Sequence, residues 1–123
     1  MNERMESFGE ALQRLGEALQ EEETDLIRDA SIQRFEFCVE LAWKSLQKYL
    51  EDEKILCQSP KSCLKEAFQL GLVEDDSLWM QMLDDRNLTV HTYKQQLAKD
   101  IYGRLSGYWD LLQRLHRQLS SKK

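Results

Sequence analysis

The sequence is poor in the residues that make rigid turns and long loops, with 1 proline and 5 glycines among 123 residues. It also lacks an uninterrupted apolar run close to the roughly 20 residues needed to span a bilayer. The acidic, amphipathic segment 1–6 lacks the features of a secretory signal peptide. We therefore expect one cytoplasmic domain over residues 1–123 without a membrane segment, because a chain of this length builds a single core.

Metal-binding and disulfide-forming residues are also scarce, with 3 cysteines and 2 histidines. Cys38, Cys57 and Cys63 are odd in number and have no C-x-x-C spacing, so they predict reduced, mostly packed thiols. His91 and His116 belong to no H-E-x-x-H motif and to no carboxylate-histidine cluster. The sequence therefore predicts no metal site and no cofactor, and His116, close to the chain end, is predicted to be solvated.

The formal net charge of −5 disfavours a broad nucleic-acid footprint, but the charge is unevenly distributed. Lysine and arginine number 7 against 14 aspartates and glutamates in residues 1–60, and 10 against 8 in residues 61–123. This balance is compatible with a small RNA gripped at one or two phosphates, and it disfavours long duplexes. Arg34, Lys44 and Lys48 could line an RNA path, although charges on a helix are more often its solvated face.

Apolar residues recur at helical spacing nearly from end to end, and no segment shows sustained strand alternation. One helix is predicted before the acidic run at 21–23, and a second begins at Thr24 or Asp25. The second helix has an apolar stripe too wide for a single seam, because Phe37 and Trp43 broaden it. Such a stripe predicts two partners for this helix, its own bundle and a second copy of the chain.

Boundary signals divide the rest of the chain. Ser59 and Pro60 predict the start of a short third helix, with serine as the N-cap and proline in the first turn. The acidic segment 74–77 predicts the start of a fourth helix that ends near Asn87, and the last helix is predicted from about Thr89 or His91 onward. We expect an all-α protein, an up-and-down four-helix bundle with short additional helices.

The segment from Arg86 to Tyr93 combines a permanent cation, an imidazole and a phenol within eight residues. Arginine can donate two N–H bonds to phosphate oxygens, and imidazole can exchange protons near neutral pH. On one continuous helix, the step from Arg86 to His91 would turn about 140° and separate the two side chains. The spacing therefore predicts a break between them if both act on one phosphate. A two-residue step on a helix turns about 200°, so Tyr93 need not share the face of His91.

The sequence resembles a known family in residues 29–46, in residues 59–72, and in the R-x4-H-x-Y motif formed by Arg86, His91 and Tyr93. This family is the nucleotidyltransferase substrate-binding proteins, also called HepT-like proteins, of the HEPN superfamily. The resemblance covers most of residues 8–120. The motif by itself is weak, but its combination with the Trp43 helix and the Ser-Pro helix start is specific.

The resemblance implies a homodimeric bundle in which two motifs face each other across a cleft. It implies a minimal nucleotidyltransferase as partner, and in some members that partner is the antitoxin of a metal-independent ribonuclease toxin. Arg86 and His91 would then be catalytic, Asn87 would match the supporting polar residue after the arginine, and Tyr93 would receive AMP from the partner. RNA, for example tRNA, would be the substrate. Other members are described only as substrate-binding subunits, which is the alternative function.

Structural interpretations of the same residues stay open at this point. Arg86 could pair with Asp84 or Asp85 as a cation near a helix C-terminus. His91 could be a hydrogen-bonded residue of a helix start, and Tyr93 a packed aromatic with a solvated hydroxyl. The three tryptophans are predicted to fill the core or an interface, namely Trp43, Trp79 and Trp109.

Overall fold

The computed structural model of the protein describes residues 3–74 and 76–121, and every element in this part of the chain is helical. In chain order the elements are α1 (Glu3–Leu19), α2 (Asp25–Asp52), α3 (Pro60–Gln69), α4 (Asp76–Leu88), the 3₁₀ helix η1 (Thr89–His91) and α5 (Gln95–Ser121). The all-α class is confirmed. Asp75, one of the acidic residues expected near the start of the fourth helix, lies outside the described residues, as do the two residues at each chain end.

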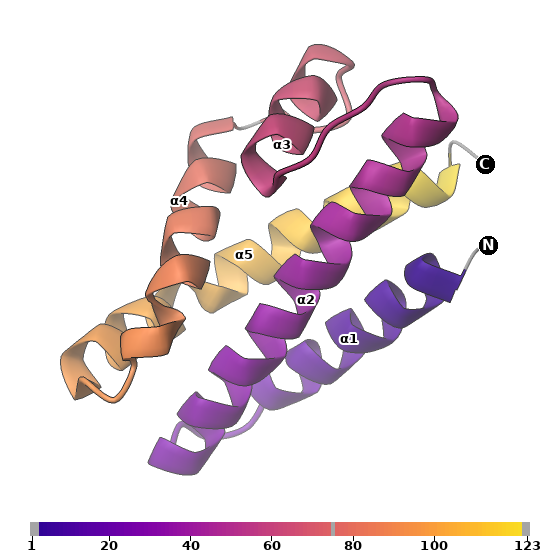
Figure 1. The fold of residues 1–123 in the computed structure, drawn as a ribbon. Coiled ribbons are helices and arrows are strands. Elements are labelled where there is room, and N and C mark those ends of the chain that lie inside the picture. The colour runs from indigo at the N-terminus through magenta and orange to yellow at the C-terminus, as the bar shows by residue number, and fades with distance from the viewer. Residues whose placement is uncertain (1–2, 75, 122–123) are drawn as a thin grey trace.

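Three long helices, α1, α2 and α5, lie side by side along most of the molecule, and α3 and α4 pack beside them (Figure 1). α1 and α2 run antiparallel, and α5 returns alongside both. The beginning of α1 and the end of α5 therefore lie at one end of the bundle, whereas the α4–α5 connection lies at the other (Figure 1). None of the helices in the described ranges combines the length and apolar character needed to cross a bilayer.

The core is built where the apolar stripes of these helices meet. Phe8 of α1, Phe35 of α2 and Tyr108 of α5 are almost completely buried, and the Phe35 and Tyr108 rings stack with centroids 5.6 Å apart. Trp79 of α4 is also buried, and Trp109 packs against the core while its indole N–H donates to the Leu12 carbonyl at 2.8 Å. The prediction that these two tryptophans fill the core is confirmed.

Two of the predicted helix starts are confirmed by their capping bonds. The Thr24 side chain accepts from the amide of Ile27 at 3.1 Å, which satisfies a free N–H group at the start of α2. Ser59 and Ser62 form a reciprocal capping box at the start of α3, with Pro60 in its first turn. Side-chain oxygens thus fix both helix starts.

The last helix begins later than predicted, at Gln95 instead of near Thr89 or His91. The Thr89 hydroxyl donates to the Arg86 carbonyl at 2.7 Å, and the Thr92 hydroxyl donates to the Thr89 carbonyl at 2.8 Å. Threonine side chains that bond to nearby backbone carbonyls compete with helical geometry. A 3₁₀ turn therefore separates α4 from α5, and the predicted break between Arg86 and His91 is confirmed.

The cysteine prediction was wrong for two of the three residues. Cys57 and Cys63 form a disulfide across the start of α3, because the loop after α2 turns back on itself before that helix begins. Their separation of six residues matches no standard short motif, so counting cysteines could not identify the pair. Cys38 is a buried free thiol, as predicted.

His116 was expected to be solvated, and this was also wrong. Its ring packs edge-on against Phe8 with centroids 5.1 Å apart, and its Nε2 lies 3.2 Å from the Met5 carbonyl oxygen. Because a carbonyl only accepts, Nε2 is the donor in this contact. The end of α5 is held against the start of α1 instead of fraying into solvent.

Candidate functional site

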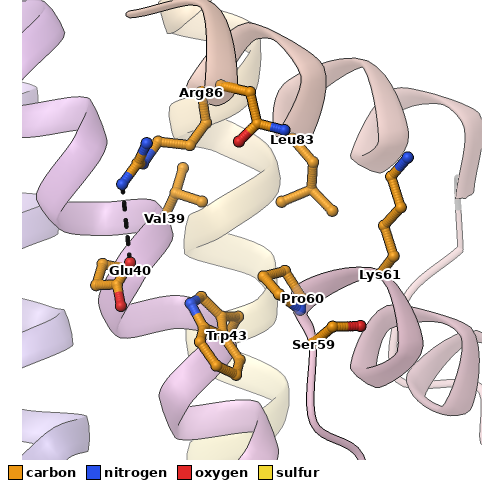
Figure 2. A pocket seen from close by; sticks show the side chains of 9 residues that line it. Val39, Glu40, Trp43, Ser59, Pro60, Lys61, Leu83 and Arg86 are labelled. Carbon is orange, nitrogen blue, oxygen red and sulfur yellow. Dashed lines mark ion pairs between the residues drawn. The ribbon is translucent and has the colours of Figure 1, made fainter. Parts of the chain in front are cut away.

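Arg86 lies in the last turn of α4 and points toward α2 (Figure 2). Its guanidinium Nη2 lies 3.9 Å from a carboxylate oxygen of Glu40, and its side chain is 31% exposed. At this distance the ion pair is loose, and a half-exposed pair of this kind contributes little to stability. The guanidinium is therefore available to an incoming anion, and it does not pair with Asp84 or Asp85 as the structural interpretation proposed.

His91 is the last residue of η1, and its imidazole is exposed to solvent. The Tyr93 hydroxyl lies 3.5 Å from His91 Nδ1, at the outer limit of a hydrogen bond, and the two rings meet edge to face with centroids 6.0 Å apart. Because a phenol both donates and accepts, it can contact either protonation state of the imidazole. The ideal-helix spacing argument for these two residues fails, because a turn and not a helix joins them.

Asp85, the residue before Arg86, is buried and accepts three hydrogen bonds from α5. Arg104 donates to its two carboxylate oxygens at 2.7 and 3.0 Å, and the Tyr108 hydroxyl donates at 2.5 Å. The bond to Asp85 raises the pKa of Arg104, and burial followed by the same carboxylate raises the pKa of Tyr108. This network fixes the end of α4 on α5 and so fixes where the backbone of Arg86 lies.

Sequence reasoning named Asp85 only as a possible partner of Arg86 and missed its bonds to α5, although a signal for its burial exists. Met82, Asp85 and Thr89 follow one another at steps of three and four residues, and all three are buried. An aspartate on the buried face of a helix requires a cationic or hydrogen-bonding partner. That pattern indicates that Asp85 belongs to an internal network, but it does not identify the residues that complete the network.

A cavity of about 330 Å³ lies between α2, the start of α3 and α4 (Figure 2). Its lining residues come in three sets: Val39, Glu40 and Trp43 from α2; Ser59, Pro60 and Lys61 from the start of α3; and Leu83, Arg86 and Asn87 from α4. Trp43 thus borders a cavity and is only partly buried, whereas Trp79 is enclosed in the core. Asn87 lines the cavity together with Arg86. No sequence pattern indicates this cavity, because three segments distant in the chain form it.

Large apolar side chains are exposed both in the motif segment and on α2. Val90 and Tyr93 are 66% and 76% exposed, and on α2 Leu26 and Phe37 are 77% and 50% exposed. A shallow depression of about 430 Å³ joins the first half of α2, including Leu26, to Thr92 of the motif segment. The motif segment and the Leu26 face of α2 are therefore neighbours, and both expose large apolar side chains.

Other candidate residues have structural partners. Lys44 pairs with Glu40 at 3.2 Å and Lys48 with Asp52 at 3.2 Å, each within one helix, and Arg34 donates to the Arg14 carbonyl at 2.6 Å. Across residues 3–74 and 76–121 there is no group of three or more His, Cys, Asp or Glu side chains placed to hold a metal ion.

Comparison with known proteins identifies the class. A model of the family described as nucleotidyltransferase substrate binding protein like matches residues 3–121. The chain belongs to this family. Its resemblance to HepT-like proteins, first inferred from the motif and the helix starts, is thereby confirmed.

Individual relatives agree with this assignment. A Haemophilus influenzae protein named "Probable ribonuclease HepT" is 34% identical over 89 residues, which are 68% of this chain and 61% of the relative. A solved structure from Thermus thermophilus has 41% identity and a TM-score of 0.87, covering 91% of this chain and 98% of that one. A second, from Haemophilus influenzae, is described as the fold of a substrate binding domain of a nucleotidyltransferase; it has 26% identity and a TM-score of 0.85, covering 94% and 98%.

Proposed function

We propose that this protein is a HepT-like endoribonuclease that acts as a homodimer without a metal ion, and that a partner nucleotidyltransferase silences it by attaching AMP to Tyr93. The observation that carries the proposal is the placement of Arg86, His91 and Tyr93 around one break between helices, with His91 and Tyr93 exposed and Arg86 only loosely paired. The relative named as a probable ribonuclease supports the same activity.

The chemistry follows from the two side chains. The imidazole of His91 takes the proton from a ribose 2′-hydroxyl as that oxygen attacks the adjacent phosphorus. The guanidinium of Arg86 stabilises the negative charge that develops on the phosphorane oxygens. The bond from phosphorus to the 5′-oxygen then breaks, and an imidazolium protonates the leaving oxygen. DNA lacks the attacking hydroxyl, so the substrate is RNA.

A dimer provides the second acid-base group. Arg86 contacts Glu40 of α2, whereas His91 contacts Tyr93, so the two groups have different neighbours within one subunit. The exposed apolar side chains Val90, Tyr93 and Leu26 would be covered if the same faces of two copies met. Such an interface places two copies of the motif beside one another, and the histidine of the second copy can then act as the acid.

Silencing by AMP needs an accessible phenol, and Tyr93 is 76% exposed. In the partner's reaction, the phenolate oxygen of Tyr93 forms a bond to the α-phosphorus of ATP, and pyrophosphate leaves. The attached group adds volume and a negative charge close to His91, where it competes with the RNA phosphate. The fold itself need not change.

The ribonuclease activity is tested by incubating the purified protein with total RNA or tRNA in excess chelator. Cleavage should be lost in His91→Ala and reduced by more than about a hundredfold in Arg86→Ala, as expected for general acid-base and charge-stabilising groups. His116→Gln and Arg114→Ala are matched controls, because both residues lie in the last part of α5, away from the motif. No cleavage, or cleavage that survives in His91→Ala, would contradict the proposal.

The AMP transfer is tested with the partner nucleotidyltransferase, ATP and magnesium. Intact mass should show one AMP on each chain, none on Tyr93→Phe, and loss of cleavage with unchanged helicity. An equal adduct on Tyr93→Phe would exclude this tyrosine as the acceptor.

A second function has its own support. The solved relative from Haemophilus influenzae is described as a substrate binding domain of a nucleotidyltransferase, and the same arginine and histidine could bind a phosphate without cleaving it. In that case RNA binding would persist while chelator-resistant cleavage is absent.

A further inference from the structure

We propose that the cavity between α2, α3 and α4 binds one unpaired nucleobase of the RNA, and that it selects bases with an exocyclic amino group. The proposal deepens the proposed function, since it takes Arg86 as the group that holds the neighbouring phosphate. Arg86 belongs both to the catalytic motif and to the cavity lining. A base inside the cavity is thus adjacent to the phosphate that this arginine contacts.

The cavity has the size and walls of a base-binding site. Its volume of about 330 Å³ lies at the small end of the range for ligand sites, which suits one base or nucleoside. The Trp43 indole forms one wall, and the apolar side chains of Val39, Leu83 and Pro60 form much of the remainder (Figure 2). A partly buried indole next to an arginine that holds phosphate offers a stacking surface for a base of single-stranded RNA.

The polar lining favours particular bases. Glu40 contributes a carboxylate, which accepts hydrogen bonds but cannot donate them when ionised. Adenine, cytosine and guanine each present an amino group to such an acceptor, as in the pairing of carboxylates with the cytosine amino group. Uracil has the O4 carbonyl oxygen where cytosine has its amino group, and a carboxylate placed to accept from that amino group repels this oxygen. The donor that uracil offers on this edge is N3–H, one ring atom further along. Lys61 and Asn87 supply donors for the base's ring nitrogens or carbonyl oxygens.

The α3 wall of the cavity is preorganised. Ser59 and Ser62 form the capping box, and the disulfide between Cys57 and Cys63 closes the loop that contains Ser59, Pro60 and Lys61. The side-chain amide of Gln47 in α2 donates to the Cys57 carbonyl at 2.8 Å, which ties this loop to α2. A wall fixed in advance loses little conformational entropy when a base enters.

Binding of short oligoribonucleotides to the His91→Ala dimer provides the test, because this variant should bind RNA without cleaving it. Oligoadenylate, oligocytidylate and oligouridylate of equal length are compared by filter binding and by quenching of tryptophan fluorescence. We expect oligouridylate to bind about tenfold more weakly than the other two. Trp43→Leu, added to His91→Ala, should weaken oligocytidylate binding by about tenfold, which lies within the range for loss of one base-aromatic stack, and should remove most of the quenching.

The second variant, Glu40→Gln, keeps the shape of the side chain and should fold normally, since Glu40 is 41% exposed. It should reduce the preference against oligouridylate to less than about twofold, because the amide can donate to uracil. Phe68→Leu, an exposed aromatic of α3 outside the cavity lining, is the matched control and should change neither property. Equal binding of the three oligomers, or unchanged binding in Trp43→Leu, would overturn the proposal.

Two further measurements separate this inference from others. Free AMP and CMP should bind much more weakly than the oligomers, and equal affinity would instead indicate a site for a free mononucleotide and overturn the RNA assignment. If the wild-type protein cleaves RNA but Trp43→Leu and Glu40→Gln change neither binding nor base preference, the base site fails and the ribonuclease stands. If base-dependent binding is found without any cleavage, the base site stands and the ribonuclease fails.

Discussion

Asp85 is the residue that connects the core to the motif most directly. It is buried, it precedes Arg86, and it accepts from Arg104 and Tyr108 of α5. Replacement of the carboxylate by an amide leaves the shape but removes the charge that Arg104 needs. The network therefore sets both the stability of the α4–α5 contact and the position of Arg86.

We expect Asp85→Asn to lower the free energy of unfolding by about 2–3 kcal/mol, measured by urea denaturation. This is below the figure for a fully buried pair, because the Arg104 side chain is 38% exposed and remains hydrated. Asp110→Asn is the control: its carboxylate pairs with Arg114 on the surface, and its loss should change stability by less than about 0.5 kcal/mol. Equal effects of the two substitutions would show that the Asp85 network is not structural.

Cys38 gives the stability a defined pH dependence. Burial raises the pKa of its thiol from an ordinary value of 9.0 to about 12. A group whose folded-state pKa is raised contributes stability that is fully present below the unfolded-state pKa and is lost as pH rises toward the folded-state pKa. The free energy of unfolding should therefore fall above about pH 9, with a slope approaching 1.4 kcal/mol per pH unit from this group.

Urea denaturation at a series of alkaline pH values measures this slope. Cys38→Ala should have a smaller slope than the wild type, even though the substitution lowers stability at every pH through the cavity it creates. Burial also raises the pKa of Tyr108, so part of the loss of stability at alkaline pH should remain in both proteins. A slope identical in wild type and Cys38→Ala would contradict the prediction.

Among the elements, α3 is the one most dependent on covalent and capping constraints. It has 10 residues, fewer than an isolated helix needs for stability in water. The disulfide closes a small loop, for which the chain-entropy relation gives about 2 kcal/mol of stabilisation. We expect the double variant Cys57→Ser/Cys63→Ser to lose about that amount under non-reducing conditions.

A reducing agent supplies the corresponding control. It should lower the stability of the wild type to near that of the double variant and leave the variant unchanged. Intact mass before and after reduction shows whether the wild type gains the two hydrogens of an opened disulfide. No gain would mean that both cysteines are free thiols.

The sequence predicted the elements better than it predicted their contacts. Helix starts at Thr24 and Ser59 could be found because capping is local and involves side chains a few residues apart. The start of α5 was misplaced because the hydroxyl bonds of Thr89 and Thr92 replace helical geometry there, and either conformation suits the same residues.

For the site, the motif residues could be found from spacing and resemblance, but the residues around them could not. Glu40 and Trp43 approach Arg86 only after α2 and α4 have packed together, and nothing in the local sequence of either helix indicates that distance. The disulfide has the same origin, because it depends on the path of the chain between α2 and α3. The periodicity of the sequence does not indicate which residues distant in the chain come close together in the fold.

At the scale of the whole molecule, the predicted homodimer depends on the apolar face around the motif. Val90→Lys should shift the protein from dimer to monomer, because it places a charge among side chains that we expect the second copy to bury. Phe68→Lys also adds a charge at an exposed apolar position, but on α3, and should leave the protein a dimer with unchanged molar mass in solution. Light scattering at micromolar concentration measures both, and circular dichroism checks that helicity is retained. A monomeric wild type would contradict the prediction.

The chain has two histidines: His91 ends η1 in the α4–α5 connection, and His116 lies in the last part of α5. The α4–α5 connection and the end of α5 lie at opposite ends of the bundle (Figure 1). His91 is exposed within the motif, whereas His116 packs against Phe8 beside the beginning of α1. The imidazole region of a proton NMR spectrum should therefore hold only two sets of ring signals, which can be assigned by the His116→Gln variant. The His91 signals should move when an oligonucleotide binds or when Tyr93 receives AMP, and the His116 signals should stay in place as an internal reference. The protein thus carries its own reporter pair, so occupancy of the motif could be followed in solution without any label.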